Sequence, residues 1–152
     1  GILLRYQQQR EPIAELGRVV MLGSPNQGSE IVDVIQDWPG MESIGGAAGM
    51  QLRTDEDSIP SKLGPVDFEL GVIAGTGTIN LLASAMLPNP DDGKVSVEST
   101  VVPGLTDHIV LPVTHTFMMN DPIVIAETIT FLEDGRFDPG LNLGDVIREA
   151  FD

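Results

Sequence analysis

The chain has 152 residues, of which 41% are apolar and 20% charged, which is typical of one globular domain, and we expect residues 1–152 to form a single domain. Its 8 basic and 23 acidic residues give a formal net charge of -15, which excludes nucleic acid as a favoured partner because phosphate binding needs clustered Lys and Arg. The absence of cysteine excludes disulfides and thiolate nucleophiles. No apolar run approaches the roughly 20 residues of a membrane-spanning helix, so we expect no integral membrane segment.

The first third of the chain contains one predicted strand between two predicted helices. Residues 1–15 favour a helix that Pro12 interrupts. The run RVVML (18–22) is rich in β-branched residues and has a glycine before and after it, which is typical of a strand buried on both faces. Apolar residues at helical spacing then extend to Trp38, and Ser29 is a candidate N-cap for that helix.

Residues 40–66 contain many Gly, Ser, Asp and Pro and show no sustained period. Long segments of this kind in compact domains are often lids or binding segments. We interpret 40–66 as an excursion from the domain, with the role of a lid left open.

The second half of the chain again alternates between apolar runs and helical patterns. FELGVIAG (68–75) and HIVLPV (108–113) are predicted strands, whereas INLLASAML (79–87) and residues 123–135 are predicted helices, the second with Gly135 as its C-cap. KVSVEST (94–100) alternates in the manner of a short extended segment. Alternating strands and helices predict an α/β fold, a parallel sheet with flanking helices. Functional residues should then follow the carboxyl ends of the strands.

Two residue types suited to acid–base chemistry occur at such positions. Asp91 and Asp92 precede Gly93 in the turn PNPDDG, and His115 follows the third apolar run. A carboxylate that orients an imidazole forms the acid–base half of a catalytic triad. However, Asp before Gly is also typical of a turn, and one His near a strand end is often structural. The residues alone leave both interpretations open.

Three segments together resemble the bacterial lipase-like α/β-hydrolases, the lipase and esterase type of this fold. GRVVMLGSPNQGSEIVD (17–33) resembles the strand and loop that follow the nucleophile helix, PDDGKVSVEST (90–100) the acid loop, and VLPVTHTFMM (110–119) the histidine loop. The resemblance implies that Asp92 is the triad acid and His115 the general base, in the order that these hydrolases use. The implied substrate is an ester or a lipid-like small molecule.

The nucleophile of such a triad is not recognisable in the sequence. In the family a G-x-S-x-G elbow precedes a helix that GILLRYQQQ resembles, and no G-x-S-x-G occurs in the 152 residues. Neither Ser24, which precedes a proline, nor Ser29 sits on a strand-to-helix turn of this kind. The resemblance therefore implies the carboxyl-terminal half of an α/β-hydrolase, a partial fold lacking the strands before the nucleophile helix. We expect this chain alone to be inactive.

The remaining candidates are weaker. His108 stands at the beginning of its apolar run, the wrong end for the site. Asp91, Asp92 and Asp107 could together bind Ca²⁺, although their spacing does not require it. GTGT (75–78) lacks the Gly-Lys-Ser/Thr of a phosphate loop. Met118 and Met119 are expected to fill the core. We therefore expect no metal and no cofactor.

A non-catalytic alternative follows from the same partial fold. Without earlier strands, the strand at 18–22 would present unpaired backbone groups along a flat apolar edge. Such an edge favours pairing with another chain. The alternative function is thus an oligomerising or interaction module, and we expect a homo-oligomer formed through this edge.

Overall fold

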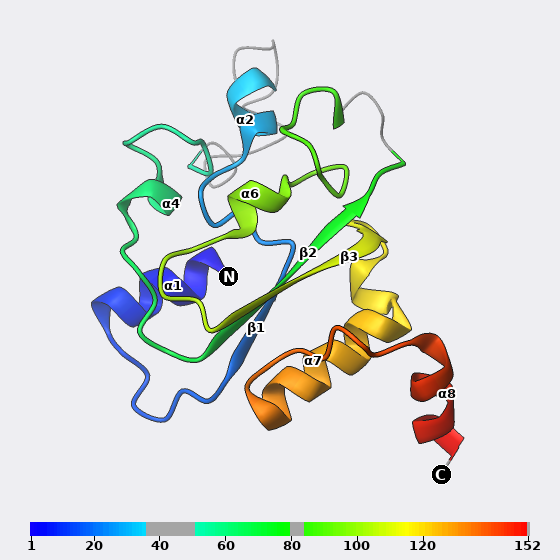
Figure 1. The fold of residues 1–152 in the computed structure, drawn as a ribbon. Coiled ribbons are helices and arrows are strands. Elements are labelled where there is room, and N and C mark those ends of the chain that lie inside the picture. The colour runs from blue at the N-terminus through cyan, green and yellow to red at the C-terminus, as the bar shows by residue number, and fades with distance from the viewer. Residues whose placement is uncertain (36–50, 80–83, 152) are drawn as a thin grey trace.

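The computed structural model describes residues 1–35, 51–79 and 84–151 (Figure 1). Its centre is a three-stranded sheet with the order β1-β2-β3, in which both pairs of neighbours are parallel. The strands are β1 (Val19–Leu22), β2 (Leu70–Gly77) and β3 (Asp107–Thr114). The three predicted strands are confirmed, each to within two residues at its ends.

Helices flank the sheet on both sides. Figure 1 shows α7 and α8 on one side of the sheet and α1, α4 and α6 on the other. The helices are α1 (Ile2–Arg10), α2 (Glu30–Ile35), α4 (Ile59–Lys62), α6 (Val97–Thr100), α7 (Pro122–Asp134) and α8 (Leu143–Phe151), with a 3₁₀ turn at Met118–Asn120. The predicted fold class, an α/β parallel sheet with flanking helices, is confirmed.

Each face of the sheet has its own core because successive strand residues point to opposite faces. Ile73 of β2 packs with Val124 and Phe131 of α7. Its neighbour Val72 joins the core of the opposite face. At Gly71 a Cβ atom would lie only 2.7 Å from the rings of Phe131 and Phe137, so glycine allows α7 to approach β2 closely.

Helix α7 is fixed at both ends by local signals in the sequence. The carboxylate of Asp121 accepts hydrogen bonds from the backbone N–H groups of Ile123 (2.9 Å) and Val124 (3.2 Å). Pro122 occupies the first turn, where no N–H is needed. Gly135 adopts the left-handed conformation (φ +75°) that ends the helix, which confirms the predicted C-cap.

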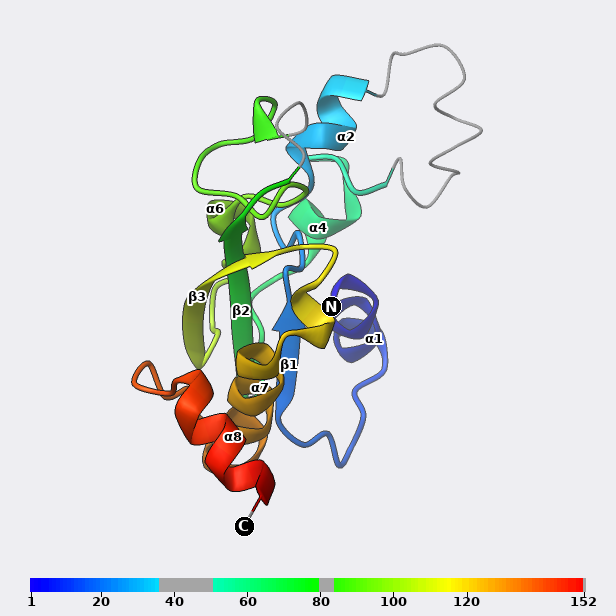
Figure 2. The same cartoon turned by 90° about the vertical axis from the view of Figure 1, so that its right-hand side faces the viewer.

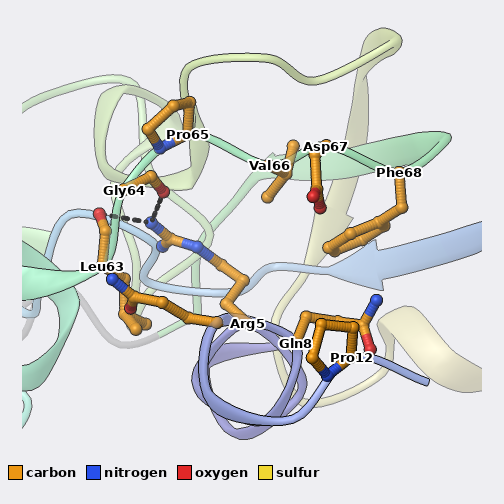
Figure 3. Close-up of a pocket in the computed structure, with 10 residues that line it drawn as sticks. Arg5, Gln8, Pro12, Leu63, Gly64, Pro65, Val66, Asp67 and Phe68 are labelled. Atoms are coloured by element: carbon orange, nitrogen blue, oxygen red, sulfur yellow. Dashed lines mark hydrogen bonds between the residues drawn. The ribbon is translucent and has the colours of Figure 1, made fainter.

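Helix α1 is shorter than predicted, and the side chain of Arg5 attaches it to neighbouring loops. It ends at Arg10, and its buried side chain is Arg5, which is 4% exposed. The guanidinium of Arg5 donates to the carbonyls of Leu63 (3.1 Å) and Gly64 (3.2 Å), as Figure 3 shows, and to that of Asn26 (2.8 Å). A cavity of about 430 Å³ lies beside these contacts, between α1 and residues 63–68.

One predicted element has the wrong type. The segment 94–100, expected to be extended, contains the helical turn α6. The side chain of Ser96 is fully buried and accepts a hydrogen bond from the N–H of Ser99 (3.1 Å), while the hydroxyl of Thr100 donates to the carbonyl of Val97 (2.7 Å). These local bonds favour a capped turn over the strand suggested by the alternating valines.

Several predictions fall partly outside the described residues. The helix expected to reach Trp38 is confirmed as α2 up to Ile35, and residues 36–38 lie outside the described part. Within 40–66 the described portion, 51–66, contains the single short helix α4. Of the helix expected at 79–87, residues 80–83 lie outside. Among the described helices, none combines the length and the apolar character needed to cross a bilayer.

Candidate active site

The candidate residues lie at the carboxyl edge of the sheet. Because the strands are parallel, β1, β2 and β3 all end at this edge. His115 follows β3 directly, and Asp92 lies in the loop that connects β2 to α6. The structure brings these two residues together, although 23 positions separate them in the sequence.

A hydrogen bond of 2.8 Å joins Nδ1 of His115 to Oδ2 of Asp92. The Asp92 side chain is 0% exposed and that of His115 is 30% exposed, so the carboxylate is buried behind the ring. A carboxylate can only accept, and Nδ1 therefore carries the shared hydrogen. This tautomer leaves Nε2 as the nitrogen that can accept a proton.

Backbone groups hold Asp92 in place. Its second carboxylate oxygen, Oδ1, accepts hydrogen bonds from the N–H groups of Lys94 (3.0 Å) and Val95 (2.8 Å). The carbonyl of Asp92 in turn accepts a bond from the N–H of His115 (2.9 Å). Bonds to an ionised acceptor are stronger than neutral ones. The acid loop and the histidine loop are thus joined by both a side-chain and a main-chain bond.

Asp91 has a different role from its neighbour. One of its carboxylate oxygens accepts from the hydroxyl of Ser84 (2.7 Å) and the other from the N–H of Gly93 (2.7 Å). Asp91 therefore organises the turn, which is the structural role that the sequence left open, whereas Asp92 contacts the imidazole.

Gly23 is a feature of the site that sequence reasoning missed. It follows β1 with a φ of +51°. A Cβ atom at this position would lie 2.9 Å from Oδ2 of Asp92 and 3.0 Å from Nδ1 of His115. Its position immediately after a strand was the available signal, because a glycine there often permits a close approach.

A cavity of about 300 Å³ opens beside the imidazole. It is lined by Leu22, Lys94, His115, Thr116, Met118 and Met119. Met118 is 2% exposed and belongs to the core, as predicted, but Met119 is 67% exposed, so its predicted core role is wrong. Met119 lies on a 3₁₀ turn that directs neighbouring side chains apart. The cavity therefore has apolar walls and, in Lys94, one exposed cationic side chain.

The two serines considered as nucleophiles do not join the pair. Ser24 is buried, and its hydroxyl lies 3.4 Å from Oδ1 of Asn26. Ser29 immediately precedes α2. Within residues 1–35, 51–79 and 84–151, no serine hydroxyl forms a hydrogen bond with His115.

His108 and Asp107 lie at the opposite end of β3. Nε2 of His108 is 2.9 Å from the hydroxyl of Thr100, and burial lowers the pKa of His108, partly opposed by the charge of Asp107. The carboxylate of Asp107 accepts hydrogen bonds from the N–H of His108 (2.8 Å) and from that of Phe137 (2.8 Å). Asp107 therefore does not join Asp91 and Asp92 at a calcium site, and no cluster of three or more metal-ligating side chains is found among the described residues.

Two solved structures of lipase BlEst2 from Bacillus licheniformis share this fold. The mature form superposes with a TM-score of 0.63 and 16% identity, over 83% of this chain and 58% of that one. The propeptide form gives a TM-score of 0.55 and 20% identity, over 74% of this chain and 29% of that one. No protein-family model and no curated protein matches the sequence. The chain thus has a lipase-like α/β fold and spans less than two thirds of either lipase chain.

Proposed function

We propose that this chain supplies the acid–base half of a carboxylic-ester hydrolase that uses a Ser-His-Asp triad. His115 is the general base and Asp92 the carboxylate that orients it. The observation that carries the proposal is the 2.8 Å bond between these two side chains at the carboxyl edge of the sheet. The lipase-like fold supports it, because a triad in such a fold is assembled at this edge.

The proposed chemistry has two half-reactions. Nε2 of His115 takes the proton of a serine hydroxyl as its oxygen attacks the ester carbonyl, and then gives that proton to the departing alcohol. In the second half, Nε2 of His115 takes a proton from water as the water oxygen attacks the acyl carbonyl. The imidazolium then gives this proton to the serine oxygen as the acyl–serine bond breaks, which releases the acid and restores the serine. Asp92 stabilises the imidazolium formed in each half.

The serine is the part that these residues do not supply. No G-x-S-x-G occurs among the 152 residues, so the proposal assigns the nucleophile to another polypeptide segment. The position of α1 supports a segment ahead of that helix. A Cβ atom on Gly1 would lie 2.3 Å from the hydroxyl of Ser24, and Ser24 follows the glycine that contacts the Asp92–His115 pair. A strand-to-helix turn before α1 would thus end beside the imidazole.

The cavity at His115 supports an ester as the proposed substrate. Leu22, Met118 and Met119 offer apolar contacts within about 300 Å³. This volume suits an ester with a short apolar group, since sites of this kind are concave and mostly apolar.

The test begins with the coding sequence upstream of Gly1. We expect an open reading frame that contains a G-x-S-x-G elbow, and the encoded protein should hydrolyse a short-chain nitrophenyl ester. His115→Ala should reduce kcat by about 10³-fold or more, whereas His108→Ala, at the other end of β3, should leave kcat nearly unchanged. The 152-residue chain alone should show no turnover. Turnover by the chain alone that His115→Ala abolishes would contradict the assignment of the serine to another segment.

A second candidate function is a non-catalytic oligomerising module. The observation that favours it is the position of β1, which within the described sheet pairs only with β2. Its other edge offers backbone groups to a further strand. If the upstream frame carries no elbow and the chain self-associates through β1, this function replaces the first.

A further inference from the structure

Helices α7 and α8 lie side by side (Figure 2). Both helices have exposed apolar side chains. On α7, Ile125, Ile129 and Leu132 are 47%, 51% and 45% exposed. Their spacing of four and then three residues places them in one stripe along the helix. On α8, Leu143 and Ile147 are each 50% exposed. Single exposed apolar residues are common, but aligned rows on two adjacent helices mark an interaction surface.

Two residues of the α7 row, Ile125 and Ile129, border a groove. A cavity of about 570 Å³ lies between the helices, and its apolar lining includes Ile125, Ile129, Leu141 and Val146. Helix α7 has 13 residues and is therefore about 20 Å long. A groove of this length between two helices matches the apolar stripe of a third helix, whose side chains at i, i+4 and i+7 would enter it.

Carboxylates gather at one end of the groove. Glu133, Asp134 and Asp138 also line the cavity, whereas no Lys or Arg does so within the described residues. Across residues 1–35, 51–79 and 84–151, neither Glu133 nor Asp134 has an ion-pair partner. Arg18, which approaches this end, pairs with Glu69 and donates to the backbone carbonyls of Leu132 and Glu133.

Like charges are close together at this end of the groove. Glu133 and Asp134 lie in the last turn of α7, where the helix dipole is already negative. Arg18 already donates to carbonyls of this last turn, and a further cation beside Glu133, Asp134 and Asp138 would reduce the repulsion among these carboxylates. The groove therefore matches a ligand that is apolar on one face and positively charged beside that face.

We propose that the groove between α7 and α8 binds a basic amphipathic helix of a different protein. The apolar face of that helix packs on Ile125 and Ile129, and its Lys or Arg side chains meet Glu133, Asp134 and Asp138. The groove shares no lining residue with the cavity at His115, so this inference does not depend on the proposed hydrolase function.

A second copy of this chain is a poorer match. Each copy carries a net charge of -15, so two acidic grooves would repel each other. The described helices also offer no basic apolar stripe. In α1 the guanidinium of Arg5 is buried, and in α8 Arg148 pairs with Asp145.

The probe for the test is a fluorescent helical peptide of about 18 residues, with Leu at i, i+4 and i+7 and Lys elsewhere. Fluorescence anisotropy with the protein at about 150 mM NaCl should show saturable binding. A matched peptide with Glu in place of Lys should bind at least about tenfold more weakly. Ile125→Ser with Ile129→Ser should weaken binding by about tenfold or more, because the buried apolar area is lost.

Two further variants separate this groove from general attraction to an acidic protein. Glu133→Gln with Asp134→Asn changes only exposed side chains, and it should weaken binding and reduce its salt dependence. Leu3→Ser is the matched control, because Leu3 is 83% exposed but lies on α1, and it should leave binding unchanged. Equal binding of both peptides, or binding unaffected by the groove variants, would overturn the proposal. Self-association that Ile129→Ser abolishes would assign the groove to a second copy instead.

Discussion

Asp91 and Asp92 are adjacent and both are 2% exposed, yet their carboxylates serve different partners. Asp91 is bonded to Ser84 and Gly93, whereas Asp92 is bonded to His115. A turn directs consecutive side chains to different sides, so the residue type alone cannot distinguish the roles of Asp91 and Asp92. Substituting each aspartate in turn can distinguish these roles.

Asp92→Asn should remove the proposed activity while preserving the shape of the site. An amide N–H₂ that faces Nδ1 favours the opposite imidazole tautomer, in which Nε2 carries the hydrogen and cannot accept one. In the serine-containing protein we expect kcat for a nitrophenyl ester to fall about 10³- to 10⁴-fold. Asp91→Asn should instead act on the loop, lowering Tm and changing kcat little. Equal losses of kcat in both variants would contradict the assigned roles.

Gly23→Ala should separate the proposed pair. The new methyl group would lie 2.9 Å from Oδ2 of Asp92, and the φ of +51° adds about 1 kcal/mol of backbone strain. Proton NMR should show loss of the low-field resonance of the Nδ1–H···Oδ2 bond. Gly17→Ala is the control, because no atom lies within 4 Å of its Cβ position, and the resonance should persist there.

Glu127 predicts a pH dependence of stability. It is 1% exposed, and its burial is the main cause that raises its pKa. The hydrogen bond from the N–H of Asp138 partly opposes this rise, whereas the nearby charges of Asp138 and Asp107 add to it. Because the folded-state pKa exceeds the unfolded value, the folded protein binds the proton more tightly, and stability decreases as pH rises from the unfolded to the folded pKa.

Glu127→Gln should remove this loss, because a neutral amide oxygen can still accept from Asp138. We expect the variant to be more stable than the parent protein above the raised pKa of Glu127, and to lose that advantage in acid. Urea denaturation at pH 8 and near pH 4.5 measures the difference. A constant difference at both pH values would exclude titration of Glu127 as its cause.

At the scale of elements, the attachment of α1 is polar. Three carbonyls from two separate segments depend on the guanidinium of Arg5. Arg5→Met should leave these acceptors buried without donors and lower the free energy of unfolding by about 2–3 kcal/mol. Arg10→Gln, on the exposed side of α1, should change it by less than about 0.5 kcal/mol. Chemical denaturation monitored by circular dichroism tests both variants.

The elements that could be predicted from the sequence are those whose signals are local or periodic. Strand β1 follows from a short β-branched run between glycines, and α7 follows from its apolar spacing and from Gly135. Helix α1 was predicted from apolar residues, but Leu3 is 83% exposed and the buried contact belongs to Arg5. Its partners lie 58 and 59 positions away, and no local pattern reports them.

At the scale of the whole molecule, topology predicted where the candidate site would form. Parallel strands end at one edge, and this rule alone brings the loops of Asp92 and His115 together. The rule did not indicate Gly23 or the exposure of Met119, because both depend on how closely loops from different strands pack. These details require the three-dimensional structure.

The open edge of β1 predicts self-association. Within the described sheet β1 pairs only with β2, and we expect sedimentation velocity at micromolar concentration to show a dimer or larger oligomer. Added NaCl should strengthen this association, because it screens the repulsion between chains of charge -15. Val20→Pro, which removes one edge N–H, should shift the protein toward monomer. A parent protein that is monomeric at every salt concentration would contradict the prediction.

The twofold connection between the acid and histidine loops also has a dynamic consequence. The N–H of His115 is bonded to the carbonyl of Asp92, beside the bond between their side chains. Neither loop can open without breaking both bonds, so the two loops should fluctuate as one cooperative unit. In deuterated solvent, the amide hydrogen of His115 should therefore exchange as slowly as those of β3, although it lies beyond the last residue of that strand.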